Sequence, residues 1–166
     1  MKSGVLTLSD KGAVGERDDT SGPMIQEMLV GIGAEITISR IIPDQEDLIS
    51  STLVDWADNK KLDLIITTGG TGVSPTDVTP EATRRVIDKE VPGISEAMRA
   101  TSLQKTPRAM LSRGISGIRG TCLIVNLPGS LKGARENLAV ILPALSHAVY
   151  KIKGGTKDCG GGETRA

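Results

Sequence analysis

Two aspartates and two glycine-containing loops are the residues of this chain whose types and spacing suit a phosphorylated ligand. The first loop lies within residues 67–80, which read Thr-Thr-Gly-Gly-Thr-Gly-Val-Ser-Pro-Thr-Asp-Val-Thr-Pro. Its glycines let backbone N–H groups approach an anion without interference from a Cβ atom. A tight strand-to-helix turn would explain a single Gly-Gly pair. The combination of Gly69, Gly70, Thr71, Gly72 and Asp77 after an apolar run favours a ligand-binding loop.

This loop differs from the two best-known phosphate-binding fingerprints. No lysine follows the glycines at the spacing of a Walker A loop. Pro75 stands where a dinucleotide-binding motif starting at Gly70 would need its third glycine. The sequence therefore predicts a phosphate site with another geometry.

Asp44 and Asp77 are the candidate acidic pair. Taken alone, Asp44 is a good candidate for a helix N-cap after Pro43, and Asp77 suits an Asx turn. Both also follow predicted buried strands, and a doubly wound sheet would direct them to one crevice at the carboxyl ends of its strands. Two carboxylates repel a phosphate unless a cation lies between them, so the pair predicts a Mg²⁺ site.

The second loop covers residues 126–132 and reads Asn-Leu-Pro-Gly-Ser-Leu-Lys. It follows an apolar run and precedes a predicted helix, whose N-terminus would favour an anion near Pro128, Gly129 and Ser130. A plain loop with a solvated Lys132 explains the same residues. Ser112 precedes another predicted strand, where most polar residues are simply at the surface.

The order of apolar runs predicts the fold class. Strands are expected at residues 4–8, 35–42, 62–68, 114–119 and 121–127, with a polar loop over residues 9–19. Helices are expected at four places: from Thr20 or Ser21 to residue 32, after Asp44, from an N-cap at Thr79, and over residues 94–103. A last helix is expected over residues 132–150, kinked or divided by Pro143.

Near-continuous apolar strands that alternate with helices predict an α/β fold, a single-domain three-layer arrangement with a mostly parallel sheet and helices on both faces. We expect this domain to span residues 1–154. The Gly-rich, polar residues 155–166 are expected to form a disordered C-terminal tail.

Composition excludes several functional classes. Lys plus Arg and Asp plus Glu both number 20, and a formal net charge of zero argues against a nucleic acid partner. One Trp, one Tyr and no Phe are too few to stack successive bases. Two cysteines provide no disulfide framework. Because no apolar run approaches about 18 residues, we predict no membrane association and a cytoplasmic protein.

From about residue 3 to residue 154 the chain resembles the molybdopterin adenylyltransferases, a family that includes the N-terminal domain of gephyrin. The loop around Gly69, Asp77, Thr79 and Pro80 is the most specific part of the resemblance. Further shared segments occur in the same order: Leu8-Ser9-Asp10, Asp18 to Pro23, Ile42-Pro43-Asp44, Met110 to Arg113, Gly117 to Gly120, and Asn126 to Ser130.

The resemblance implies a homotrimer that transfers AMP from ATP to the terminal phosphate of molybdopterin with Mg²⁺, and possible delivery of the product to a molybdenum-insertion protein. Asp44 and Asp77 would be the catalytic and metal-binding residues. The resemblance also implies two sets of binding residues. Nucleotide and phosphate would contact Gly69, Gly70, Thr71, Gly72 and Asp10; molybdopterin would contact Ser112, Pro128, Gly129 and Ser130. No general base is expected, since a phosphate monoester with a second pKa of about 6 is already largely dianionic at pH 7.

Two alternatives remain open: a catalytically silent molybdopterin carrier of the same fold, and a structural or scaffolding trimer. The presence of both Asp44 and Asp77 counts against the silent carrier. A lone domain with no linker or partner module gives the scaffold little support.

Overall fold

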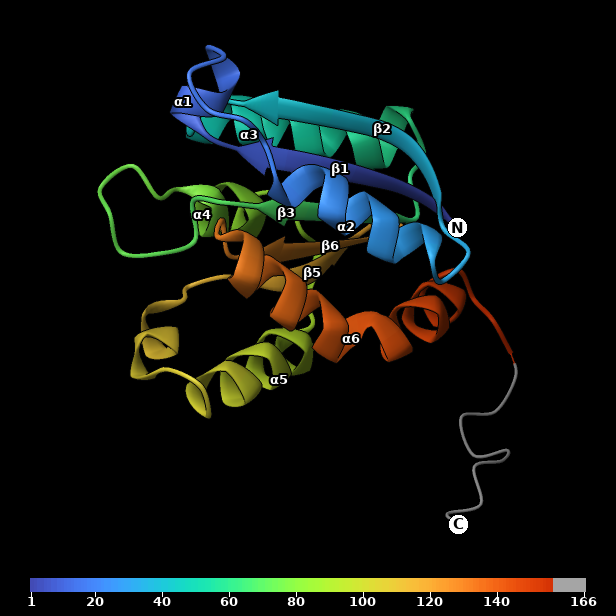
Figure 1. Ribbon diagram of the computed structural model, residues 1–166. Coiled ribbons are helices and arrows are strands. Elements are labelled where there is room, and N and C mark those ends of the chain that lie inside the picture. Colours follow the sequence, from blue (N-terminus) through green and yellow to red (C-terminus); the bar gives the residue numbers. More distant parts are fainter. Residues whose placement is uncertain (157–166) are drawn as a thin grey trace.

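A six-stranded sheet forms the centre of the computed structural model, which describes residues 1–156 (Figure 1). The strands lie in the order β2-β1-β3-β6-β5-β4. Their bounds are β1 (Lys2–Leu8), β2 (Glu35–Ile42), β3 (Leu64–Thr68), β4 (Lys89–Glu90), β5 (Ser116–Arg119) and β6 (Cys122–Leu127). Only the β5–β6 and β4–β5 pairs are antiparallel, which confirms the predicted mostly parallel sheet.

Helices cover both faces of this sheet. The α-helices are α1 (Asp10–Ala13), α2 (Ser21–Val30), α3 (Glu46–Val54), α4 (Thr79–Arg84), α5 (Pro92–Leu103) and α6 (Leu131–Ile152). A turn of π-helix, η1 (Asp55–Asn59), continues α3, and a 3₁₀-helix, η2 (Pro107–Leu111), follows α5. Figure 1 shows α2, α5 and α6 on one side of the sheet and α3 and α4 on the other.

Each face of the sheet has its own apolar cluster. Val5, Ile66 and Val125 pack with α2, α5 and α6, whereas Leu6 and Ile65 pack with α3, η1 and α4. Successive side chains of a strand point to opposite faces, so a strand buried on both sides must be apolar at every position. The continuous apolar runs therefore predicted the three-layer α/β fold correctly.

At the starts of three helices, the observed capping differs from the predicted capping. The N-cap of α3 is Gln45, which makes no side-chain cap, and Asp44 lies one residue further back. Thr20 is at the N-cap of α2 without capping it, because Asp19 Oδ1 instead accepts from the backbone N–H groups of Ser21 and Gly22. Thr79 is the first residue of α4, not its N-cap.

Two further local predictions need correction. The expected polar loop after β1 contains the short helix α1, which Ser9 caps by accepting a hydrogen bond from Gly12 N at 3.0 Å. Pro143 lies inside α6, so the predicted division of this helix is wrong, and the alternative, a kink at Pro143, stays a prediction. Proline removes one backbone N–H donor, and the packing of α6 against the sheet keeps the helix continuous across that loss. The predicted tail falls mainly on residues 157–166, outside the described residues.

Candidate functional site

The loops that follow the parallel strands meet at one edge of the sheet. β1 and β2 end at the paired residues Leu8 and Ile42, and β3 and β6 end at the paired residues Thr68 and Leu127. The two predicted ligand loops touch there, since a Cβ built on Gly129 would lie 3.1 Å from Gly69 Cα. The two loops therefore lie side by side at the carboxyl ends of the parallel strands.

Two cavities open at this edge. The first has a volume of about 520 Å³, and we call it the basic cavity. Its charged lining residues are Arg99, Lys105, Arg108, Lys132, Asp77 and Glu136. The second has a volume of about 460 Å³, and we call it the acidic cavity. Its charged lining residues are Asp18, Asp19, Asp44, Asp77 and Arg17.

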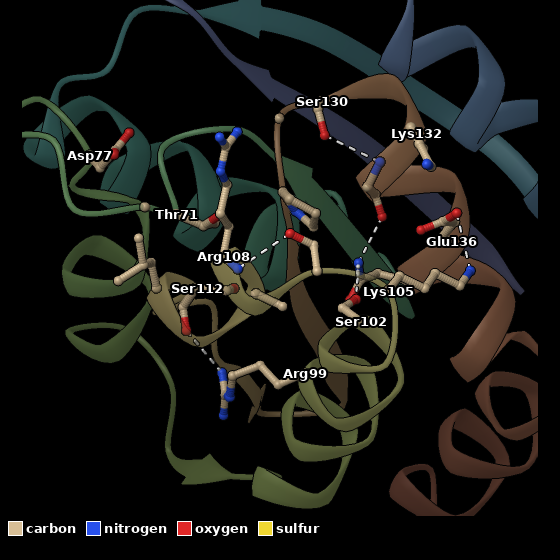
Figure 2. Close-up of a pocket in the computed structure, with 18 of the residues that line it drawn as sticks. Thr71, Asp77, Arg99, Ser102, Lys105, Arg108, Ser112, Ser130, Lys132 and Glu136 are labelled. Atoms are coloured by element: carbon tan, nitrogen blue, oxygen red, sulfur yellow. Dashed lines mark hydrogen bonds and ion pairs between the residues drawn. The ribbon is translucent and has the colours of Figure 1, made fainter.

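Two cations of the basic cavity are available to a ligand. Figure 2 shows Lys105 and Arg108 on the side of α5 and η2, with Lys132 opposite them at the start of α6. Lys105 pairs with Glu136 at 3.1 Å. Neither Arg108 nor Lys132 forms an ion pair with any residue in the described part of the chain. An anion bound between them would supply the missing counter-charge.

The two cavities share a wall made of Gly70, Asp77, Gly129 and Ser130. Ser130 is the N-cap of α6, where its Oγ accepts from Gly133 N at 3.2 Å. The N-terminus of a long helix carries partial positive charge and unpaired N–H groups. The wall therefore offers one phosphate-binding element to ligands in both cavities.

Asp44 is held against the glycine loop. A Cβ built on Gly70, whose φ is +60°, would lie 2.8 Å from Asp44 Oδ1 and 2.3 Å from Thr79 Oγ1. Asp44 Oδ1 is buried and has no hydrogen-bond partner among the described residues. Burial raises the pKa of Asp44, and the nearby charges of Asp10 and Asp77 raise it further, although a hydrogen bond from the backbone of Asp10 opposes the rise.

Asp77 stands at the other side of the glycine loop. Its Oδ2 accepts a hydrogen bond from Ser74 N at 2.9 Å and would lie 2.9 Å from a Cβ built on Gly72. Asp77 N donates to Ser74 O at 3.0 Å, which closes a β-turn, and Thr79 N donates to Gly70 O, so the Asx turn considered for Asp77 does not form. Asp77 thus borders both cavities from a turn that is exposed on its outer side.

Residues 4–147 match the family described as a probable molybdopterin binding domain. This chain belongs to that family. It is 43% identical over 157 residues to the molybdopterin adenylyltransferase of Helicobacter pylori strain J99, a match that covers 91% of this chain and 87% of the relative.

Other members of the family differ in length and share the fold. The chain is 44% identical over 165 residues to gephyrin of Dictyostelium discoideum but spans only 23% of that longer relative. The crystal structure of the molybdopterin biosynthesis enzyme MoaB from Thermus thermophilus superposes with a TM-score of 0.88 at 52% identity. That match covers 92% of this chain and 96% of the MoaB chain.

The carboxylates of the site suit a metal ion that a ligand helps to hold. A buried carboxylate oxygen without a partner, as in Asp44, is the kind of group that a cation satisfies. No group of three or more His, Cys, Asp or Glu side chains in the described part of the chain could hold a metal by itself. Mg²⁺ commonly uses one or two carboxylates together with substrate phosphates and water, so Asp44 and Asp77 fit that mode.

The predicted site residues are distributed over both cavities, and residues of one loop do not all line the same cavity. Gly69 lines the acidic cavity, whereas Thr71, Gly72, Ser112 and Pro128 line the basic cavity. Gly70, Gly129 and Ser130 line both. Asp10 lines neither cavity, although its neighbour Ser9 does, and its carboxylate supports the backbone of Asp44.

Four charged residues stand out among those of the site that were not predicted. Arg99, Lys105 and Arg108 come from α5 and the segment after it, which the sequence presents as ordinary solvated charges. Asp19 was noted only as part of a shared segment, yet it accepts from Thr7 Oγ1 at 2.7 Å and organises the start of α2. No local motif marks the three cations, because only the fold brings them beside the N-terminus of α6.

Proposed function

We propose that this protein transfers AMP from ATP to the terminal phosphate of molybdopterin, a step of molybdenum cofactor biosynthesis. The observation that supports this most is the pair of cavities with opposite charge that share a glycine-rich wall. A transferase for two anionic substrates needs a binding site for each substrate and a place where the two reacting phosphates come together. The name of the Helicobacter pylori relative agrees with this activity.

The charges of the two cavities support the assignment of one substrate to each. The basic cavity suits molybdopterin, whose phosphate monoester would lie near Arg108, Lys132 and the start of α6. The acidic cavity would repel a bare phosphate because Asp18, Asp19 and Asp44 line it. An anion enters such a cavity only together with a cation, and ATP is the substrate that binds as its Mg²⁺ complex.

The reaction then takes place at the shared wall. A phosphate oxygen of molybdopterin forms a bond to the α-phosphorus of ATP, and the bond from that phosphorus to the bridging oxygen breaks. The electron pair of the broken bond leaves with pyrophosphate. The attacking monoester is already largely dianionic at pH 7, so no residue needs to remove a proton. The chain contributes by holding the two phosphates together in line, which can account for much of the rate.

Asp44 and Asp77 are proposed as the carboxylates that hold Mg²⁺ beside the triphosphate. Asp44 Oδ1, buried and without a partner among the described residues, lies beside Gly70 in the shared wall. When bound, Mg²⁺ would neutralise charge on the phosphate oxygens. Backbone groups of Gly70 and Gly129 and the N-terminus of α6 would orient the phosphates next to it.

The assembly predicted from the family resemblance and the location predicted from composition remain predictions. A homotrimer, a cytoplasmic location and product transfer to a molybdenum-insertion protein are each part of the proposal. The apolar residues of α6 pack largely into the core of this same chain, as Leu138, Ile141 and Leu145 show, so they give the trimer no separate support. Light scattering at micromolar concentration would test the trimer, and a stable monomer would reject it. No helix in the described part of the chain is long and apolar enough to cross a membrane.

A silent molybdopterin carrier is the second candidate. The structure gives it one supporting observation, since the basic cavity alone is large enough to hold a small ligand. A carrier has no need of a second, acidic cavity with a partnerless carboxylate, so this candidate is less well supported.

One assay decides between them. Purified protein is mixed with molybdopterin, ATP and Mg²⁺, pyrophosphate release is followed, and the product is identified by its mass. Adenylylated molybdopterin formed in step with pyrophosphate supports the transferase. Tight molybdopterin binding without either product would identify a carrier and reject the proposed reaction.

A further inference from the structure

Arg113 lies outside both cavities, yet its side chain hydrogen-bonds to the segment that carries Asp77. That segment, residues 71–78, connects β3 to α4 and extends from the body of the protein as a green loop in Figure 1. Val73 in this loop is 63% exposed, so burial does little to fix the loop. Its position must come from polar contacts.

The guanidinium of Arg113 joins the two ends of this loop. Arg113 Nε donates to Gly72 O at 2.6 Å, and Nη2 donates to Asp77 O at 2.6 Å. The third nitrogen, Nη1, pairs with Glu81 at the start of α4. The backbone N of Arg113 also donates to Thr71 O at 2.8 Å. One planar side chain therefore fixes the loop where it begins and where Asp77 stands.

Arg113 is itself held by the wall of the basic cavity. The preceding residue, Ser112, lines that cavity, and Arg99 donates to Ser112 O at 3.5 Å and to Gly114 O at 2.8 Å. Figure 2 shows Arg99 and Ser112 joined in this way below Asp77. Arg113 thus connects the lining of the basic cavity to the loop that carries Asp77.

We propose that Arg113 is a positioning residue that fixes Asp77 in the wall shared by the two cavities. The inference rests on the proposed function, in which Asp77 acts at the point where the two phosphates meet. Arg113 lines neither cavity, so we expect its side chain to act on the reaction indirectly, by holding the backbone carbonyls of Gly72 and Asp77. Its fork geometry matters more than its charge, because a lysine cannot span two carbonyls in fixed directions.

The test compares Arg113→Met and Arg113→Lys with the matched control Arg119→Met. Arg119 makes a similar fork, with Nε and Nη2 bonded to Asp58 at 3.0 and 2.6 Å and Nη1 bonded to Val86 O at 2.8 Å. It lines neither cavity. Its removal should therefore report the general cost of losing a forked arginine without disturbing the site.

The first measurement is hydrogen–deuterium exchange of the ligand-free proteins, which does not depend on activity. Peptides covering residues 71–79 should exchange about 10-fold faster in Arg113→Met and Arg113→Lys than in wild type, since the loop ends are released. Arg119→Met should leave those peptides unchanged. Equal protection of residues 71–79 in wild type and both Arg113 variants would overturn the proposal, whatever reaction the protein catalyses.

The second measurement is steady-state adenylylation. The kcat of Arg113→Met and of Arg113→Lys should fall by about 10- to 100-fold, with the KM for molybdopterin changing less than about 3-fold, because misplacement of a reacting group costs turnover more than binding. Full activity in Arg113→Lys would show that charge alone matters and would overturn the positioning role. If wild type forms no adenylylated product, the proposed function fails, and the exchange measurement decides this inference alone.

Discussion

The basic and acidic cavities are similar in volume and share a wall, yet the charges that predominate in them are opposite in sign. Arg99, Lys105, Arg108 and Lys132 dominate one, and Asp18, Asp19 and Asp44 dominate the other. The formal net charge of the whole chain is zero. A balanced composition therefore excludes a surface-wide basic field but says nothing about local separation of charge. The separation itself suits an enzyme that must bring one bare anion and one metal-bound anion together.

The largest expected effect comes from a substitution in the wall that the two cavities share. Asp77→Asn should lower turnover by about 100- to 1000-fold, roughly 2.7–4 kcal/mol of barrier, because the carboxylate acts where charge develops on the phosphates. Molybdopterin binding should survive, since its phosphate gains nothing from a nearby carboxylate. Adenylylation rates and equilibrium molybdopterin binding check this across a Mg²⁺ series.

Equal activity in wild type and Asp77→Asn would reject Asp77 as an essential residue. Loss of molybdopterin binding together with activity would place Asp77 in the molybdopterin site and remove the basis of its metal assignment.

The next effect should be confined to the basic cavity. Replacement of either Arg108 or Lys132 by Gln should raise the KM for molybdopterin by about 10- to 100-fold, since one charge-assisted hydrogen bond contributes roughly 1.5–3 kcal/mol. The KM for ATP should change little. Initial rates with each substrate varied in turn measure both, and Arg17→Gln in the acidic cavity is the control. A larger rise in the KM for ATP than for molybdopterin would reverse the assignment of substrates to cavities.

A smaller effect on stability should appear in the acidic cavity. The raised pKa of Asp44 means that the folded protein binds its proton more tightly than the unfolded chain does. The ionised carboxylate therefore costs stability, and this cost grows as pH rises from the ordinary value of 3.8 through the raised pKa. Asp44→Asn lacks the charge, so its Tm should match wild type at low pH and exceed it by about 2 °C at neutral pH.

Thermal unfolding of the ligand-free proteins from about pH 3.5 to about pH 8 tests this, a range that spans the titration of a carboxyl group with a raised pKa. A neutral-pH Tm below that of wild type would contradict the account of Asp44 as a destabilising carboxylate. The same variant should lose adenylylation. A residue that function requires can lower the stability of the fold, so its replacement raises Tm and removes activity.

The smallest effect should follow removal of residues 156–166. Tm and turnover should change by less than about 1 °C and about 2-fold, because Gly160-Gly161-Gly162 and the charged residues near it have no apolar side chains to bury. Truncation after Tyr150 is the matched control. It removes the ion pair of Lys153 with Asp63 at 2.8 Å and should lower Tm clearly. A similar loss in both truncations would show that the last residues belong to the folded domain.

How much the sequence could predict depended on whether the information was local. The apolar runs at residues 64–66 and 122–125 predicted strands buried on both faces, because burial follows directly from side-chain type. The loops after β3 and β6 were predicted from their glycines, which reflect local backbone needs. Helix caps were less predictable. Asp44 and Thr79 have side chains that suit an N-cap. In the fold, however, Asp44 Oδ1 lies beside Gly70, and the Thr79 hydroxyl donates to Gly69 O.

The cations of the basic cavity and the role of Arg113 could not be predicted from sequence. Arg99, Arg108 and Lys132 belong to three separate elements, and only the packing of α5 against α6 places them together. Arg113 looked like a surface residue next to a strand, since its partners Gly72 and Asp77 are 41 and 36 positions away. Such contacts depend on the topology of the sheet.

The measurement that tests the central claim most directly is a crystal structure of the protein with Mg²⁺, molybdopterin and an ATP analogue whose α–β bridge cannot be cleaved. The account predicts molybdopterin in the basic cavity between Arg108 and Lys132, and the analogue in the acidic cavity with the metal at Asp44. The two phosphates should meet beside Gly70, Asp77 and Gly129. Both ligands in one cavity, or the two ligands exchanged between cavities, would contradict the proposal that the basic cavity binds molybdopterin and the acidic cavity binds ATP.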